Sequence, residues 1–138
     1  VVLDTSVLVA AIRSDAGASR RLLLGVLDGK IKTLASVPLM IESEAVMTRP
    51  EHLAASGLSA EDVGVLLDAI AAAVEPVKLD FLWRPALKDA DDDMVLEAAV
   101  NGRADAIVTF NARDFSPHAE RFGVSVQSPQ DAMKSLGV

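Results

Sequence analysis

The stretch VVLDTSVLVAA (residues 1–11) contains a single charged residue, Asp4, in a run of otherwise uncharged and mostly apolar residues. Residues 1–3 form the continuous apolar run that is typical of a parallel strand buried on both faces. The apolar residues after Thr5 and Ser6 suit a helix, which either hydroxyl side chain can cap. Because an unpaired charge is costly in an apolar setting, Asp4 needs solvent, a cation or hydrogen-bond donors. We therefore expect a buried first strand that carries a carboxylate at its carboxyl end.

Predicted strands and helices alternate along the rest of the chain. The apolar segments predict further strands at 31–36, 104–110 and 123–128, and a short edge strand at 75–79. Helical periodicity and capping residues predict helices at 6–13, 19–30, 37–50, 59–74, 91–102 and 129–136. This alternation predicts an α/β fold in three layers, with a central, mainly parallel sheet and helices on both faces. No linker interrupts it, so residues 1–138 are expected to form a single domain.

The composition excludes several classes of function. The chain has 138 residues and no cysteine, which removes disulfides, thiolate zinc sites and cysteine nucleophiles. No apolar run reaches the roughly 18 residues of a membrane span, and no export signal is visible, so we expect a cytoplasmic protein without membrane contact. A net charge of −7 disfavours nucleic-acid binding when taken alone. Basic residues nevertheless group in the first quarter of the chain, at Arg13, Arg20, Arg21, Lys30 and Lys32.

Acidic residues occur in four separate places that could form one site. They are Asp4, the pair Glu42 and Glu44, the run DADDD at 89–93, and Asp114. Sites in parallel α/β sheets form outside the carboxyl ends of the strands, and Asp4 and Asp114 each follow such an end. Carboxylates gathered there repel one another unless they share a cation, and oxygen ligands suit Mg²⁺ or Mn²⁺.

Each of these acids can also serve an ordinary structural role. Asp4 can cap the following helix, and Asp114 can close a turn. Asp89 and Asp92 can serve as an N-cap and its N3 partner. Periodicity does not choose between Glu42 and Glu44, because they flank the apolar stripe of their helix on either side. His52 and His118 are expected to be surface residues in loops.

Four motifs together resemble those of PIN-domain ribonucleases in order and spacing. They are VVLDTSVLVAA, IESEAVMTRP, KDADDDMVLEAAV and ADAIVTFNARDF. Within that family the sequence is most similar to the toxin components of bacterial toxin–antitoxin (VapC-like) systems. The resemblance covers nearly the whole chain and implies a PIN-like fold.

The resemblance assigns roles to particular residues. Four acids correspond to the catalytic and metal-binding residues of the family, namely Asp4, Glu42, Asp92 and Asp114. Glu42 is favoured over Glu44 because an aliphatic pair, Val46 and Met47, follows it at the family's spacing. Supporting or alternative positions are Ser6, Glu44, Asp89, Asp93, Thr109 and Asn111. The sequence departs from the pattern at Asn111, where many relatives have Asp, and at Ser43, where an aliphatic residue is usual.

The activity that the resemblance implies is endonucleolytic cleavage of single-stranded RNA with Mg²⁺ or Mn²⁺ as cofactor. Arg13, Arg20, Arg21 and Arg113 are the expected contacts to RNA phosphates. A cognate antitoxin protein and a homodimer are the expected partners.

Three alternative functions also involve a PIN-like fold or clustered acids, and the sequence disfavours each. A PIN-fold module that binds protein without catalysis is disfavoured by the presence of acids at all four places. An aspartyl-phosphate enzyme of the haloacid-dehalogenase type requires D-x-D after the first strand, whereas residue 6 is Ser. A receiver domain needs an acidic pair just after its first strand, and LDTSV does not supply one.

Overall fold

The computed structural model describes residues 1–80 and 90–138, and in the second range its side chains from Asp92 onward. Asp89, the expected companion acid, lies outside the described residues. The elements in chain order are β1 (Val2–Leu3), α1 (Thr5–Arg13), α2 (Ala18–Leu27), β2 (Leu34–Ala35), α3 (Val37–Met47), α4 (Pro50–Ser56), α5 (Ala60–Ala73), β3 (Glu75–Pro76), α6 (Ala90–Asn101), β4 (Ala106–Val108), α7 (Ala112–Arg121), β5 (Ser125–Gln127) and α8 (Pro129–Leu136).

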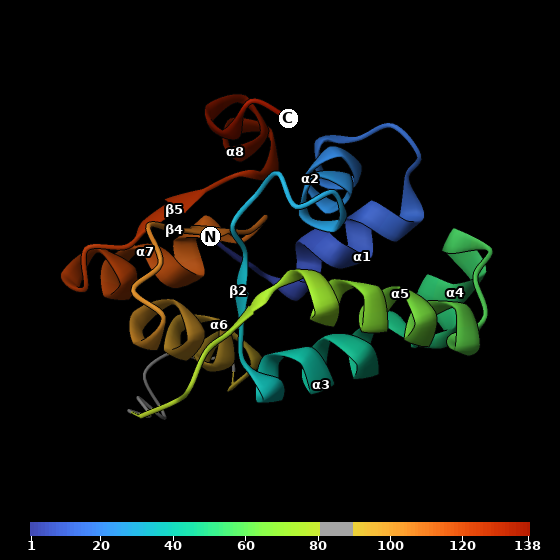
Figure 1. Ribbon diagram of the computed structural model, residues 1–138, viewed down its shortest axis with the longest axis horizontal. Coiled ribbons are helices and arrows are strands. Elements are labelled where there is room, and N and C mark those ends of the chain that lie inside the picture. Colours follow the sequence, from blue (N-terminus) through green and yellow to red (C-terminus); the bar gives the residue numbers. More distant parts are fainter. Residues whose placement is uncertain (81–89) are drawn as a thin grey trace.

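The described strands form one parallel layer. β1 pairs with β4 and β4 with β5, and β2 pairs with β3, all in parallel. Val1 connects the two groups, because its nitrogen donates to Lys32 O at 2.8 Å and its carbonyl accepts from Leu34 N at 2.8 Å. This is the alternating pattern of a parallel ladder. The strand order is therefore β3-β2-β1-β4-β5, with the N-terminal strand in the middle (Figure 1).

Successive residues of the central strands point to opposite faces of the sheet. Leu3 and Val108 belong to one core cluster, which contains buried residues of α1, α2, α5 and α8. Val2 and Ile107 belong to a second cluster, which contains buried residues of α6 and α7. Helices therefore cover both faces of the sheet, and the expected three-layer α/β/α architecture is confirmed.

Helix α5 begins with a capping box, and the predicted edge strand is confirmed. Ser59 accepts from Asp62 N at 3.0 Å, while the Asp62 carboxylate accepts from Ser59 N at 2.9 Å, so α5 begins where the sequence indicated. β3 lies at the edge of the layer and includes Pro76, which has no N–H for a further strand.

Two helices differ from the expectation drawn from the sequence. The predicted helix over 37–50 ends at Met47, and Pro50 is the first residue of α4, a position that proline favours. No helix is predicted between residues 110 and 123, but α7 lies there, with Asn111 as its N-cap residue. Pro117 lies inside α7, and a proline at that position argues against a helix in the sequence. Phe115 and Ala119, four residues apart, are buried and pack this helix against the core.

Candidate active site

Asp4 lies where β1 ends and α1 begins, and its side chain is fixed by two hydroxyl groups. Ser6 Oγ donates to Asp4 Oδ2 at 2.8 Å, and Thr109 Oγ1 donates to the same oxygen at 2.7 Å. Thr109 directly follows β4 and is 1% exposed, and Asp4 N donates to Val108 O at 2.9 Å. The ends of the two paired strands thus hold the carboxylate between them.

These contacts correct the expected capping of α1. Asp4 itself is the N-cap residue, and its side chain makes no capping hydrogen bond. Thr5 and Ser6, the expected caps, use their hydroxyls elsewhere: Thr5 Oγ1 lies 2.9 Å from Ser43 Oγ, and Ser6 Oγ donates to Asp4. Within the described residues both side-chain hydrogen bonds of Asp4 go to Oδ2. Oδ1 is therefore the oxygen that Asp4 can offer to a cation.

Asp4 lines an open cleft of about 360 Å³ at the carboxyl edge of the sheet. The side chains that line this cleft, here called the Asp4 cleft, come from five parts of the chain: Asp4, Thr5, Ser6, Val9, Glu42, Val46, Arg49, His52, Asp92 and Asn111.

The α3 helix carries Glu42 into the Asp4 cleft. Ser36, which follows β2, caps α3 by accepting from Leu39 N at 3.3 Å. Two turns later Glu42 is half-buried in the cleft lining, whereas Glu44 is exposed and outside it. Ser43, between them, is 1% exposed and meets Thr5 of α1. The residue that departs from the family pattern thus joins α3 to α1.

The remaining predicted acids are divided between the Asp4 cleft and other places. Asp92, in the first turn of α6, lines the cleft, whereas Asp93 is 2% exposed and outside the lining. Asn111 lines the cleft, but Asp114, in the first turn of α7, is exposed and outside it. The structure therefore gathers Asp4, Glu42 and Asp92, with Asn111 in place of a fourth acid.

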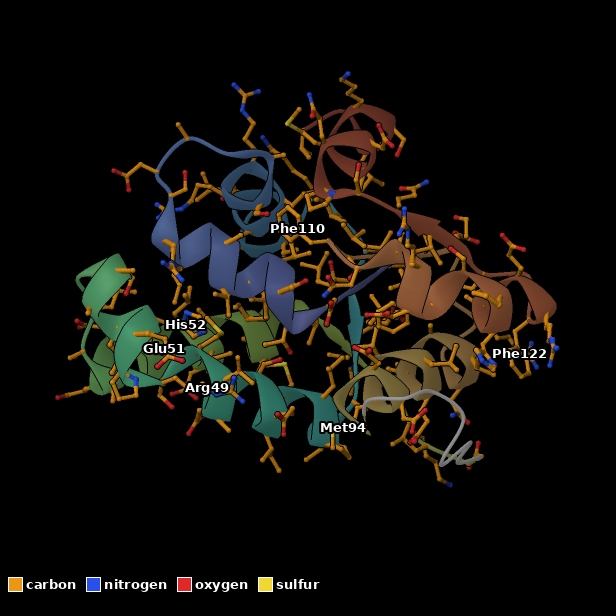
Figure 2. All side chains as sticks on the ribbon, turned by 180° about the vertical axis from the view of Figure 1, so that it is seen from behind. Arg49, Glu51, His52, Met94, Phe110 and Phe122 are labelled. Carbon is orange, nitrogen blue, oxygen red and sulfur yellow. The ribbon has the colours of Figure 1, made fainter. Side chains whose placement is uncertain are left out.

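Helix α4 supplies a basic wall that the sequence did not predict. Arg49, its N-cap residue, and His52 in its first turn both line the Asp4 cleft. They lie on the same side of the molecule (Figure 2). His52 is half-buried rather than in an exposed loop, and its Nδ1 lies 3.3 Å from Arg13 Nη1. Pro50 is the sequence signal for this wall, because a proline that begins a helix makes Arg49 its N-cap and places His52 in its first turn.

The other predicted RNA contacts do not line the Asp4 cleft. Arg20 Nε donates to Ala11 O at 2.7 Å, its Nη2 lies 3.6 Å from Asp15, and its side chain lines a different hollow. Arg21 and Arg113 are exposed and outside the cleft lining. Arg13 reaches the cleft only through His52.

The donor set of the Asp4 cleft suits a hard divalent cation bound partly through water. Within residues 1–80 and 92–138 no three Asp, Glu or His side chains are close enough to surround a metal directly. Mg²⁺, however, usually takes only one or two carboxylates and keeps several waters. Oxygen ligands from Asp4, Glu42 and Asp92, around an open space of this size, fit that mode of binding.

The structure defines an α/β domain with an acidic cleft at the carboxyl edge of its sheet. A family model described as a PIN domain matches residues 1–113. Because the match covers 113 of 138 residues, the chain belongs to the PIN domain family. PIN domains are in general nucleases and typically use divalent metal ions. The matched range includes Asp4, Glu42, Asp92 and Asn111 and ends one residue before Asp114.

Two further comparisons add no relatives. Neither the curated proteins nor the solved structures gave a match. Among the helices that the structure describes, none is long and apolar enough to cross a membrane.

Proposed function

We propose that this chain is an endoribonuclease that cleaves single-stranded RNA in the Asp4 cleft with Mg²⁺ or Mn²⁺ as cofactor. The observation that carries the proposal is the clamp on Asp4, formed by Ser6 and Thr109 at the ends of β1 and β4. Two hydroxyl donors hold one oxygen of the carboxylate, so the other oxygen points in a fixed direction. Residues that hydrogen-bond to a metal ligand orient it in the same way.

The acidic residues are proposed to hold the cation and the attacking water. Asp4 offers Oδ1, and Glu42 and Asp92 accept hydrogen bonds from water in the cleft. When bound, the cation supplies an activated water and neutralises charge on the phosphoryl oxygens. Asp114, which is exposed on α7 and outside the lining of the Asp4 cleft, is proposed to hydrogen-bond to water molecules at the edge of the cleft.

The basic wall is proposed to attract the anionic substrate once the bound cation offsets the acids of the cleft. Charges more than about 8 Å away are largely screened at physiological salt, so the charge near the cleft outweighs the total of −7. Arg49 and His52 line the same cleft as the acids, and Arg13 lies beside His52. We propose that these three residues hold the phosphates that flank the cut.

The biological role proposed is that of a cytoplasmic toxin controlled by an antitoxin, and it rests on the resemblance of the four motifs. Exposed apolar side chains outside the cleft, such as Val37, Ile41 and Val65, offer surface for an antitoxin or a second copy of the chain. Light scattering of the purified protein tests the homodimer. Growth arrest on expression, relieved by the product of a neighbouring small gene, tests the toxin role.

The test of the catalytic proposal is cleavage of a fluorescently labelled single-stranded RNA with Mn²⁺, with Mg²⁺ and with EDTA. Cleavage should require the metal and be lost in Asp4→Asn. Asp28→Asn, which changes an exposed acid at the end of α2, is the matched control and should cleave normally. A folded wild-type protein that cleaves no RNA with either metal would show the proposal to be wrong and favour the protein-binding module.

A further inference from the structure

A hollow of about 390 Å³, separate from the Asp4 cleft, lies where the end of α1 meets the starts of α2 and α8. This hollow, here called the Phe110 hollow, is lined by uncharged side chains that include Ala10, Ser14, Phe110 and Pro129. Its volume is in the range of small-molecule pockets. A neutral hollow with an aromatic ring and hydroxyl groups differs in chemistry from the acidic Asp4 cleft.

Phe110 gives the hollow an exposed aromatic surface. Phe110 is 57% exposed, although a phenylalanine just after a buried strand ordinarily packs into the core. Figure 2 shows it well apart from Phe122, the other labelled phenylalanine, so the two do not form a common apolar patch. A single exposed ring beside a nuclease cleft suits the stacking of a nucleobase.

The Phe110 hollow adjoins the Asp4 cleft in two places. Ser6 lines the cleft and Ala10 lines the hollow, and the two are one turn apart on the same face of α1, about 6 Å along its axis. Phe110 itself stands between Thr109, which holds Asp4, and Asn111, which lines the cleft. One nucleotide step of an extended strand can span this separation.

We propose that the Phe110 hollow binds the nucleotide next to the one that is cut in single-stranded RNA. Its base stacks on the Phe110 ring, which is exposed in this hollow. This inference rests on the proposed function, because it assigns a second contact to the same RNA.

The test measures binding rather than cleavage. Asp4→Asn serves as the background, and the probe is a short single-stranded RNA of mixed sequence that carries fluorescein and one 2-aminopurine, whose fluorescence falls when it stacks on an aromatic ring. Phe110→Ala should bind about 5- to 150-fold more weakly and lose the fluorescence change. Phe110→Trp should restore both. Phe122→Ala, which removes an exposed ring at the end of α7, should leave both unchanged.

RNA binding that is insensitive to Phe110→Ala overturns the inference and leaves the nuclease proposal standing. A protein that neither binds nor cleaves RNA overturns both.

Discussion

Replacement of Thr109 by valine isolates the clamp on Asp4, because valine keeps the shape of threonine and removes its hydroxyl. In the wild type Thr109 Oγ1 donates to Asp4 Oδ2 at 2.7 Å and accepts from Asn111 N at 3.0 Å. Thr109 is 1% exposed and Asp4 is 7% exposed, so water does not readily replace the lost donor. A hydrogen bond to a charged group contributes about 1.5–3 kcal/mol, and we expect Thr109→Val to lower the free energy of unfolding by that amount.

The same substitution should weaken metal binding, because Asp4 loses one of the two groups that orient it. Loss of a residue that orients a metal ligand typically lowers metal affinity about 10- to 100-fold. The Mn²⁺ concentration that gives half-maximal RNA cleavage should therefore rise by that factor. Ser6→Ala removes the other donor and should raise it similarly.

Urea denaturation and Mn²⁺ titration of cleavage measure the two effects, with Thr33→Val as the control. Thr33 is also buried, but its hydroxyl makes only a long contact of 3.5 Å to Ile31 O. The control should lose less stability and leave the Mn²⁺ midpoint unchanged. The reasoning is refuted if Thr109→Val keeps the wild-type midpoint, or if Thr33→Val shifts it equally.

Three further predictions concern the acids, the basic wall and the helix cap. Glu42→Gln should abolish RNA cleavage while Glu44→Gln keeps most of it, with folding checked by circular dichroism; the reverse ranking would put the ligand at Glu44. Arg49→Gln should make the plot of log RNA affinity against log salt concentration less steep by about 0.7, which corresponds to the loss of one phosphate contact. An unchanged slope would show that Arg49 does not contact an RNA phosphate. Hydrogen bonds from the N–H and hydroxyl of Ser59 hold the pKa of Asp62 in the folded protein below its usual 3.8. The charged Asp62 carboxylate therefore stabilises the fold above that pH, and this contribution is lost as the pH falls through the pKa of Asp62 in the folded protein. Thermal scans of Asp62→Asn should therefore show a loss of stability at neutral pH that vanishes in acid, and a pH-independent difference would contradict the capping role.

The sequence predicted the layers of the fold because their signals are local. A continuous apolar run such as residues 1–3 is buried on both faces wherever it lies, and the Ser59–Asp62 capping box is closed within one turn. The α4 and α7 helices escaped prediction because proline is an ambiguous local signal. Pro50 can follow one helix or begin the next, and Pro117 argues against a helix that buried Phe115 stabilises from the core.

The candidate acids were predictable as a set, but their geometry was not. The motifs indicated Asp4, Glu42, Asp92 and Asp114, and the structure leaves Asp114 outside the cleft lining. Nothing in the helical periodicity separated Glu42 from Glu44. The structure separates them because Ser43 is buried against Thr5, which turns one flank of α3 toward α1 and the other toward solvent. The basic wall was missed for the same kind of reason, since Arg49 and His52 reach the cleft only after α4 packs beside α1.

The sequence by itself determined a three-layer α/β domain with a carboxylate at the end of its first strand, because periodicity and caps act over a few residues. Only the tertiary structure decided what that carboxylate meets. Thr109 lies 105 positions from Asp4 in the chain, and their contact exists because β1 and β4 pair in register. The Phe110 hollow likewise joins the ends of α1, α2 and α8, which no local pattern relates. Contacts between distant segments depend on the order of strands and the packing of helices, and these are settled by burial of the whole core rather than by any single stretch of sequence.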